Sequence, residues 1–122
     1  MSYRQKEVKK SQKESFFLQE IATLFLKLSI EEKHLQDLYI SRVELSPDGG
    51  LCNVFFHTPL GYNSFQERKK DLILYKPSMR AAMAKASHAR YVPDLRFLYD
   101  DGLDKQQKME DLFNKLKNEG KL

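Results

Sequence analysis

Basic side chains gather in one stretch of this chain, and phosphate binding is the chemistry they could perform. Residues 66–96 hold eight Lys or Arg residues against three acidic ones, a net charge of +5, whereas the whole 122-residue chain carries +4. The segment YKPSMRAAMAKASHARYVP, residues 75–93, contains no Asp or Glu. Positive charge concentrated in this way suits a polyphosphate partner, and the alternative is a solvated surface kept for solubility. Charge alone leaves these two interpretations level.

The acid-free segment predicts a helix over residues 77–88 with two different faces. Met79 and Met83 gather on the side that should pack on a sheet. The other side offers cations, with Ala81 and Ala84 between them that are small enough for a sugar-phosphate backbone to approach. The N-terminus of this helix, at its proline and serine, would add free N–H groups for a phosphate. The charge asymmetry favours binding over a helix whose basic residues are merely solvated.

Residues that could support catalysis or metal binding are poorly arranged for either. His34, His57 and His88 are scattered and show no metal-ligand spacing. The pair Asp100-Asp101 could suggest a metal-dependent nuclease, but adjacent aspartates at a strand end are more often turn or cap residues. The single cysteine, Cys52, excludes an internal disulfide and any CxxC metal site. We therefore expect neither an enzyme nor a metal or cofactor.

The composition favours one small domain in a reducing compartment. A chain of 122 residues that is 41% hydrophobic can fill a single small core. One cysteine fits the cytoplasm. The most apolar run, FFLQEIATLFLKLSI, carries Gln, Glu and Lys and is too short and polar to span a bilayer. We expect a cytoplasmic monomer without membrane contact.

A helix and a β-hairpin are predicted for the first half of the chain. After a flexible stretch, 1–10, apolar residues recur at helical spacing over 11–29. Alternation with a period of two predicts strands over 38–45 and 51–57, which the turn sequence SPDGG joins. The core face of the first strand should carry Tyr39, Val43 and Leu45.

Two helices at an angle, a third strand and a terminal helix are predicted for the second half. Ser64 is a plausible N-cap for a helix over 65–75, and a proline should open the next helix over 77–88. Alternation returns over 95–100, and 103–117 forms a last amphipathic helix. The resulting order, α-β-β-α-α-β-α, predicts an α+β sandwich with helices packed on one face of a three-stranded sheet.

Two stretches, SRVELSPDGGLCNVFF and SMRAAMAKASHARYVPDLRFLYDDG, resemble the two signatures of the ribosome-binding factor A family (RbfA). SRVELSPDGGLCNVFF is similar to the family's hairpin signature, in which a Val-x-x-Ser-x-Asp-type turn leads into an alternating strand. SMRAAMAKASHARYVPDLRFLYDDG resembles its second signature, which runs from an Arg on a helix through a basic stretch to Val-Pro-(Asp/Glu)-Leu-x-Phe and a closing aspartate. Both signatures occur in the family's order, and the resemblance covers roughly residues 5–115. The matches in the second signature are Arg80, Arg90, Val92, Pro93, Asp94, Leu95, Phe97 and Asp100.

The resemblance implies an RNA-binding domain of the KH-like type II topology over 11–100, with a C-terminal helix and polar tail over 101–122. Members of this family bind the immature small (30S) ribosomal subunit and assist late maturation and 5′ processing of 16S rRNA, especially in the cold. They are assembly factors in ribosome biogenesis, not enzymes. The alternative is a protein–protein interaction module with a basic surface and no RNA affinity. The candidate RNA-binding residues are Lys69, Lys70, Lys76, Ser78, Arg80, Ala84, Lys85, His88 and Arg90.

The connection between the two middle helices departs from the family pattern. Ordinary KH domains clamp nucleotides with a GxxG loop, and the resembled family has a kink there, typically Ala-x-Gly. Here Tyr75, Lys76 and Pro77 occupy the kink, and a proline can still bend the chain. Gly102 is a second departure, because a serine commonly begins the family's last helix. The sequence leaves open whether that helix packs on its own core or on a partner.

Overall fold

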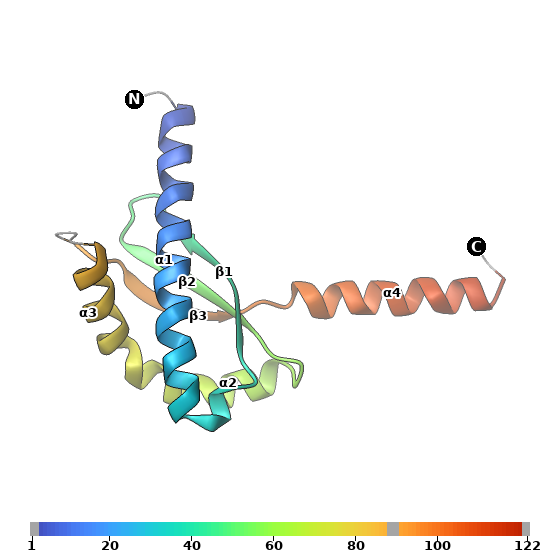
Figure 1. The fold of residues 1–122 in the computed structure, drawn as a ribbon. Helices are drawn as coiled ribbons and strands as arrows, with labels where there is room; N and C mark the ends of the chain where they lie inside the picture. Colours follow the sequence, from blue (N-terminus) through green and yellow to red (C-terminus); the bar gives the residue numbers. More distant parts are fainter. Residues whose placement is uncertain (1–2, 88–90, 121–122) are drawn as a thin grey trace.

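Three strands form one sheet with β2 at its centre (Figure 1). In the computed structural model, which describes residues 3–87 and 91–120, β1 (Tyr39–Leu45) pairs antiparallel with β2 (Leu51–His57). β2 pairs in parallel with β3 (Asp94–Tyr99) on its other side. The turn between β1 and β2 places Gly49 at a φ of 75°, which glycine adopts without the steric cost of a Cβ. These observations confirm the predicted hairpin and third strand.

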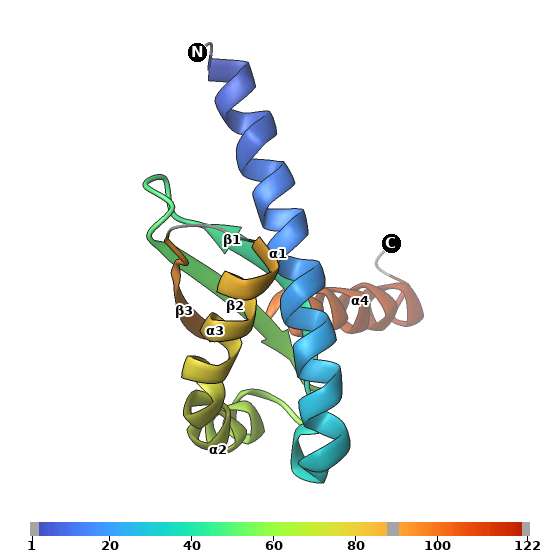
Figure 2. The same cartoon turned by 60° about the vertical axis from the view of Figure 1, so that its left-hand side comes forward.

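Helices cover one face of this sheet, and the terminal helix projects away from it. α1 and α3 lie together across the sheet (Figure 2), whereas α4 extends from the end of β3 into solvent (Figure 1). Short 3₁₀ helices connect α1 to β1 and α2 to α3. The α+β, KH-like arrangement is therefore confirmed. The helices are α1 (Tyr3–Glu31), η1 (Lys33–Leu35), α2 (Tyr62–Leu72), η2 (Ile73–Tyr75), α3 (Lys76–Ser87) and α4 (Gly102–Asn118).

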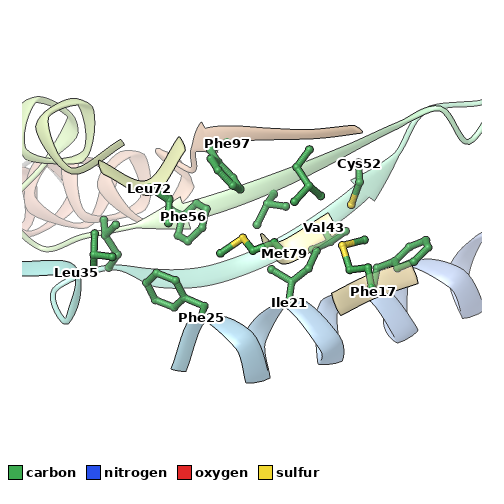
Figure 3. Close-up of a cluster of buried hydrophobic side chains, with 14 of the residues drawn as sticks. Phe17, Ile21, Phe25, Leu35, Val43, Cys52, Phe56, Leu72, Met79 and Phe97 are labelled. Carbon is green, nitrogen blue, oxygen red and sulfur yellow. The ribbon is translucent and has the colours of Figure 1, made fainter. Parts of the chain in front are cut away.

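An aromatic cluster centred on Phe56 holds the helices to the sheet (Figure 3). The ring centre of Phe56 lies 5.4 Å from that of Phe25 on α1, 6.2 Å from Phe65 on α2 and 5.6 Å from Phe97 on β3. Each buried aromatic side chain contributes about 1.5–3 kcal/mol by leaving water, and aromatic pairs in edge or offset geometry add to this. One strand residue thus joins three other elements, which fixes α2 relative to β3.

The predicted core face of β1 was wrong at Tyr39, which is 58% exposed. The register with β2 shifts between Ile40 and Arg42, so Ser41 is an extra residue in a β-bulge. A bulge changes the alternation by one residue, and Ile40 therefore packs against the core in place of Tyr39. Beyond the bulge, Val43 is buried as predicted.

Two helices begin earlier than predicted. α1 begins at Tyr3 rather than near Ser11, because the polar residues before Ser11 are mostly good helix formers, with neither glycine nor proline among them. α2 begins at Tyr62, since Gly61 precedes it with a φ of 92° that ends the loop. The predicted cap, Ser64, lies inside α2, where its hydroxyl donates to the Leu60 carbonyl at 3.4 Å.

The base of α4 is fixed to the sheet by hydrogen bonds. The Asp100 carboxylate accepts the Gly102 N–H at 3.0 Å, and the Tyr99 hydroxyl donates to Asp104. Burial, followed by the hydrogen bond with Asp104, raises the pKa of Tyr99 to about 12. Beyond its base, the apolar stripe of α4 is open to solvent: Met109, Leu112 and Phe113 are 71%, 55% and 58% exposed. Among the helices in residues 3–87 and 91–120, none is long and apolar enough to cross a membrane.

Candidate nucleic-acid interface

The two helices that carry six of the eight basic residues in 66–96 meet at a single 3₁₀ turn. η2 follows α2 directly and leads directly into α3. Of the three predicted kink residues, Tyr75 therefore belongs to the turn, whereas Lys76 and Pro77 already belong to α3. Proline fits this place because the first turn of a helix does not need its missing N–H.

The start of α3 does not offer the free N–H groups that the sequence suggested. The backbone stays helical through Leu72, Ile73 and Lys76, and the Lys76 N–H donates to the Ile73 carbonyl. The turn thus supplies acceptors to the first residues of α3, and Pro77 has no N–H to offer. Phosphate binding on this surface would therefore depend on side chains rather than on a helix terminus.

Tyr75 ties the 3₁₀ turn to the end of α1. Its hydroxyl donates to the Glu32 carboxylate at 2.8 Å. This hydrogen bond raises the pKa of Tyr75, because an ionised phenol would face the carboxylate's negative charge. An alanine, as in the Ala-x-Gly kink of the resembled family, could not form this hydrogen bond.

The outer face of α3 is bounded by Arg80 on one side and Lys85 on the other. Five residues at 3.6 residues per turn place these two side chains roughly 140° apart around the helix axis. Ala81 and Ala84 lie between them, the first exposed and the second half-buried. The two methionines of α3 are buried on the opposite side, as predicted. A polyanion would therefore meet a shallow strip with a cation at each margin.

Two lysines extend this strip toward the edge of β3. The Lys76 ammonium lies 5.7 Å from the ring centre of Phe97, and the Lys69 ammonium lies 6.0 Å from that of Phe65. Both lysines are half-buried, and their ammonium groups are within reach of a cation–π interaction with these rings. Lys70, also on α2, is exposed. The rings hold two cations in place next to the edge strand.

Arg80 has a structural contact that the sequence did not indicate. Its Nε donates to the Pro93 carbonyl at 3.3 Å, and its terminal Nη2 donates to the Val92 carbonyl at 3.2 Å. The side chain therefore anchors the segment that leads into β3 while remaining exposed. No sequence pattern marks a guanidinium that binds main-chain carbonyls twelve and thirteen residues away.

Among residues 3–87 and 91–120, no ion pair compensates the cations of this surface. The acidic residues next to it have other partners: Asp71 pairs with His34 at 2.7 Å, and Asp37 pairs with Arg68 at 3.0 Å. The surface defined by these uncompensated cations is called the basic face from here on. The basic face consists of Lys69, Lys70, Lys76, Arg80 and Lys85.

Three of the predicted RNA-binding residues, Ser78, His88 and Arg90, are not among the cations that define the basic face. Ser78 is exposed on the same side of α3 as Lys85, beside a shallow groove against α1. His88 and Arg90 lie outside the residues that the structure describes, so their part in the basic face stays a prediction.

The candidate catalytic residues have structural partners. Asp100 accepts hydrogen bonds from the Ser41 hydroxyl at 2.7 Å and from the N–H of Gly102, and it lies 3.5 Å from Arg42. These donors, Ser41 first, lower the pKa of Asp100. Burial raises the pKa of the Cys52 thiol to about 12. In the part of the chain that the structure describes, no three His, Cys, Asp or Glu side chains are grouped so as to hold a metal ion.

Comparisons with known proteins agree on one family. Residues 9–113 match the sequence model of a family described as ribosome-binding factor A. The chain is 34% identical over 93 residues to ribosome-binding factor A of Francisella philomiragia, covering 76% of this chain and 64% of that relative. It is 30% identical over 92 residues to that of Xanthomonas axonopodis pv. citri, covering 75% of this chain and 70% of the relative.

The fold is also similar to a solved structure. The crystal structure of ribosome-binding factor A from Thermus thermophilus superposes with a TM-score of 0.64 at 24% identity, covering 74% of this chain and 93% of that one. This similarity concerns the fold. The chain spans slightly less than two thirds of the length of the Francisella relatives that it matches.

Proposed function

Because the chain belongs to the ribosome-binding factor A family, we propose that it binds the small ribosomal subunit through its rRNA and assists late maturation of that subunit. In this proposal the protein acts as an assembly factor rather than as an enzyme. Its role includes processing of the 5′ end of 16S rRNA. The protein would act in the cytoplasm as a monomer without a cofactor.

The observation that carries this proposal is the uncompensated charge of the basic face. Five cations from α2 and α3 are without carboxylate partners in residues 3–87 and 91–120, and small residues separate two of them. RNA presents regularly spaced phosphates that such a surface can neutralise with release of counterions. Lys69 and Lys76 are in addition held against aromatic rings, which lowers the entropy lost when a phosphate binds.

Sucrose-gradient fractionation of cells tests the proposal. The wild-type protein should sediment with free small subunits and be scarce on translating ribosomes. The double reversal Lys70→Glu and Lys85→Glu should leave the helical circular dichroism spectrum unchanged and move the protein to the top of the gradient. Lys108→Glu and Lys117→Glu on α4 make the matched control, because they change the same charge on exposed residues far from the basic face. Equal sedimentation of both double variants would refute the assignment.

The exposed stripe of α4 favours a second function, as a protein-interaction module. Met109, Leu112 and Phe113 recur at helical spacing on a helix that stands away from the body (Figure 1). If this were the protein's only mode of binding, small-subunit binding would survive loss of the basic face and depend little on salt. The same gradients, run with Leu112→Asp and Phe113→Asp, separate the two functions.

A further inference from the structure

A groove opens between the N-terminal half of α1 and the end of α3, outside the basic face. It has a volume of about 480 Å³, and Gly49 of the β1–β2 turn contributes to its lining. Its lining combines basic and aromatic side chains from segments far apart in the sequence. The residues used below are Lys9, Lys13, Phe16, Ala86, Tyr91 and Pro93. This volume lies within the range of sites that hold small organic groups, about 300–1,000 Å³.

Two exposed aromatic rings face this groove from different elements. Phe16 on α1 is 36% exposed, and Tyr91, which precedes β3, is 79% exposed. The ring of Phe16 meets the buried Phe17 edge-on at 5.7 Å, so its position is fixed by the core. Ala86, which also lines the groove, contributes only a methyl group and is exposed. Exposed rings of this kind are the platforms on which unpaired bases stack.

The cations at this groove have no ion-pair partner among the side chains that the structure describes. Lys9 and Lys13 are four residues apart on α1 and therefore lie on one side of the helix. Both are exposed, and neither takes part in an ion pair within residues 9–87 and 91–120. The neighbouring carboxylate of Glu14 accepts the Leu45 N–H at 3.2 Å, and that of Asp94 accepts the Leu95 N–H at 2.9 Å. The groove thus presents positive charge and aromatic surface together.

We propose that this groove is a nucleotide subsite, which seats an unpaired base of single-stranded RNA against Phe16 and Tyr91 with its phosphates at Lys9 and Lys13. The proposal rests on the proposed RNA-binding function and adds a second contact region to it. Arg80 connects the two regions, because its hydrogen bonds to the Val92 and Pro93 carbonyls hold the segment that carries Tyr91. Pro93 itself lines the groove, so the basic face and the groove adjoin at this residue.

Two fluorescently labelled octanucleotides test this subsite by anisotropy. One is an oligoadenylate, and the other has the same length and phosphates with abasic sites throughout. Stacking of one base contributes about 1–3 kcal/mol, so the oligoadenylate should bind roughly tenfold more tightly. Phe16→Ala should remove that preference and leave the abasic affinity unchanged. Lys9→Gln with Lys13→Gln should weaken both strands and reduce the log–log salt slope by about 1.4.

Two further variants keep the outcome interpretable. Leu26→Ala is the control, because Leu26 is another exposed apolar residue of α1, 63% exposed, and it does not line the groove. Tyr91→Ala provides a second test of stacking in a segment without regular structure, should Phe16→Ala alter the circular dichroism spectrum. Both Phe16→Ala and Tyr91→Ala should lower the preference for bases, and Leu26→Ala should not.

Failure of the subsite can be told apart from failure of the RNA-binding function. Equal affinity for the two strands, with binding lost in Lys70→Gln and Lys85→Gln, overturns the nucleotide subsite alone. Absence of binding to either strand at low salt overturns both proposals. If the strands bind equally while Phe16→Ala weakens sedimentation with small subunits, the groove holds a protein segment instead, which also contradicts the subsite.

Discussion

Replacement of Tyr75 by phenylalanine tests whether the tether to Glu32 fixes the turn between α2 and α3. The change removes one hydrogen bond of 2.8 Å and keeps the ring. A hydrogen bond to a charged group contributes about 1.5–3 kcal/mol when buried. Tyr75 is only half-buried and the Glu32 side chain is 38% exposed, so we expect the loss of stability to lie below that range. Glu32→Ala in a double-mutant cycle should give a coupling energy of similar size.

The assay is urea unfolding followed by circular dichroism at 222 nm, because the chain has no tryptophan. A loss of this size should lower the unfolding midpoint by roughly 0.5 M urea. Tyr62→Phe is the matched control, because Tyr62 is 56% exposed and its ring contact with Tyr99 is kept by phenylalanine. Its midpoint should not move.

The difference in unfolding free energy between wild type and Tyr75→Phe should depend on pH in a definite direction. Because the hydrogen bond raises the pKa of Tyr75, its contribution is fully present below the unfolded value of about 10 and is lost as pH rises through the raised value. The stability gap between wild type and Tyr75→Phe should therefore be constant from pH 7 to 9 and close above pH 10. A coupling energy near zero, or a gap that widens in alkali, would refute the tether.

Three further predictions concern the sheet and its edge. Asp100→Asn should cost about 1 kcal/mol at pH 7, and the difference should vanish in acid as pH falls through the lowered pKa of Asp100, as urea unfolding at pH 7 and pH 2 would show; a constant gap would contradict its role as an acceptor. Cys52 should react with a thiol reagent at pH 8 at least 100-fold more slowly in the folded protein than in urea, and comparable rates would contradict its burial. Ile40→Ala should cost about 1–2 kcal/mol and Tyr39→Ala less than 0.5, whereas the reverse order would contradict the bulge.

Strand periodicity predicted the sheet well wherever the chain alternates without interruption. On β2, Cys52, Val54 and Phe56 are all buried, as a period of two requires. On β1 the same reasoning failed at Tyr39, because Ser41 forms a bulge and nothing in its residue type announces one. The bulge is stabilised by a partner far along the chain, since the Ser41 hydroxyl donates to Asp100. A local sequence pattern does not indicate a hydrogen bond between residues so far apart in the chain.

Helical periodicity predicted that α4 is amphipathic, but it did not indicate what its apolar stripe contacts. The stripe is exposed because α4 leaves the sheet at the Asp100 hydrogen bond to Gly102 and projects outward (Figure 1). A helix that buries such a stripe on its own core has the same sequence pattern as one that keeps it for a partner. The direction of α4 relative to the sheet depends on tertiary contacts, which helical periodicity does not indicate.

The candidate site was predicted from charge, and its geometry was not. The scarcity of acidic residues around Lys76 and Lys85 correctly indicated cations without carboxylate partners in the described part of the chain. The contact of Arg80 with the Val92 carbonyl and the groove beside Phe16 were missed, because each joins segments that meet only in the fold.

The salt dependence of binding to purified small ribosomal subunits tests the central claim most directly. For the wild type, contacts from about four of the five cations of the basic face to single-stranded RNA give a log–log slope near −3. Lys70→Gln with Lys85→Gln should reduce the magnitude of this slope by about 1.4, whereas Lys108→Gln with Lys117→Gln on α4 should leave it unchanged. The same slope in all three proteins would contradict the assignment of the basic face to rRNA.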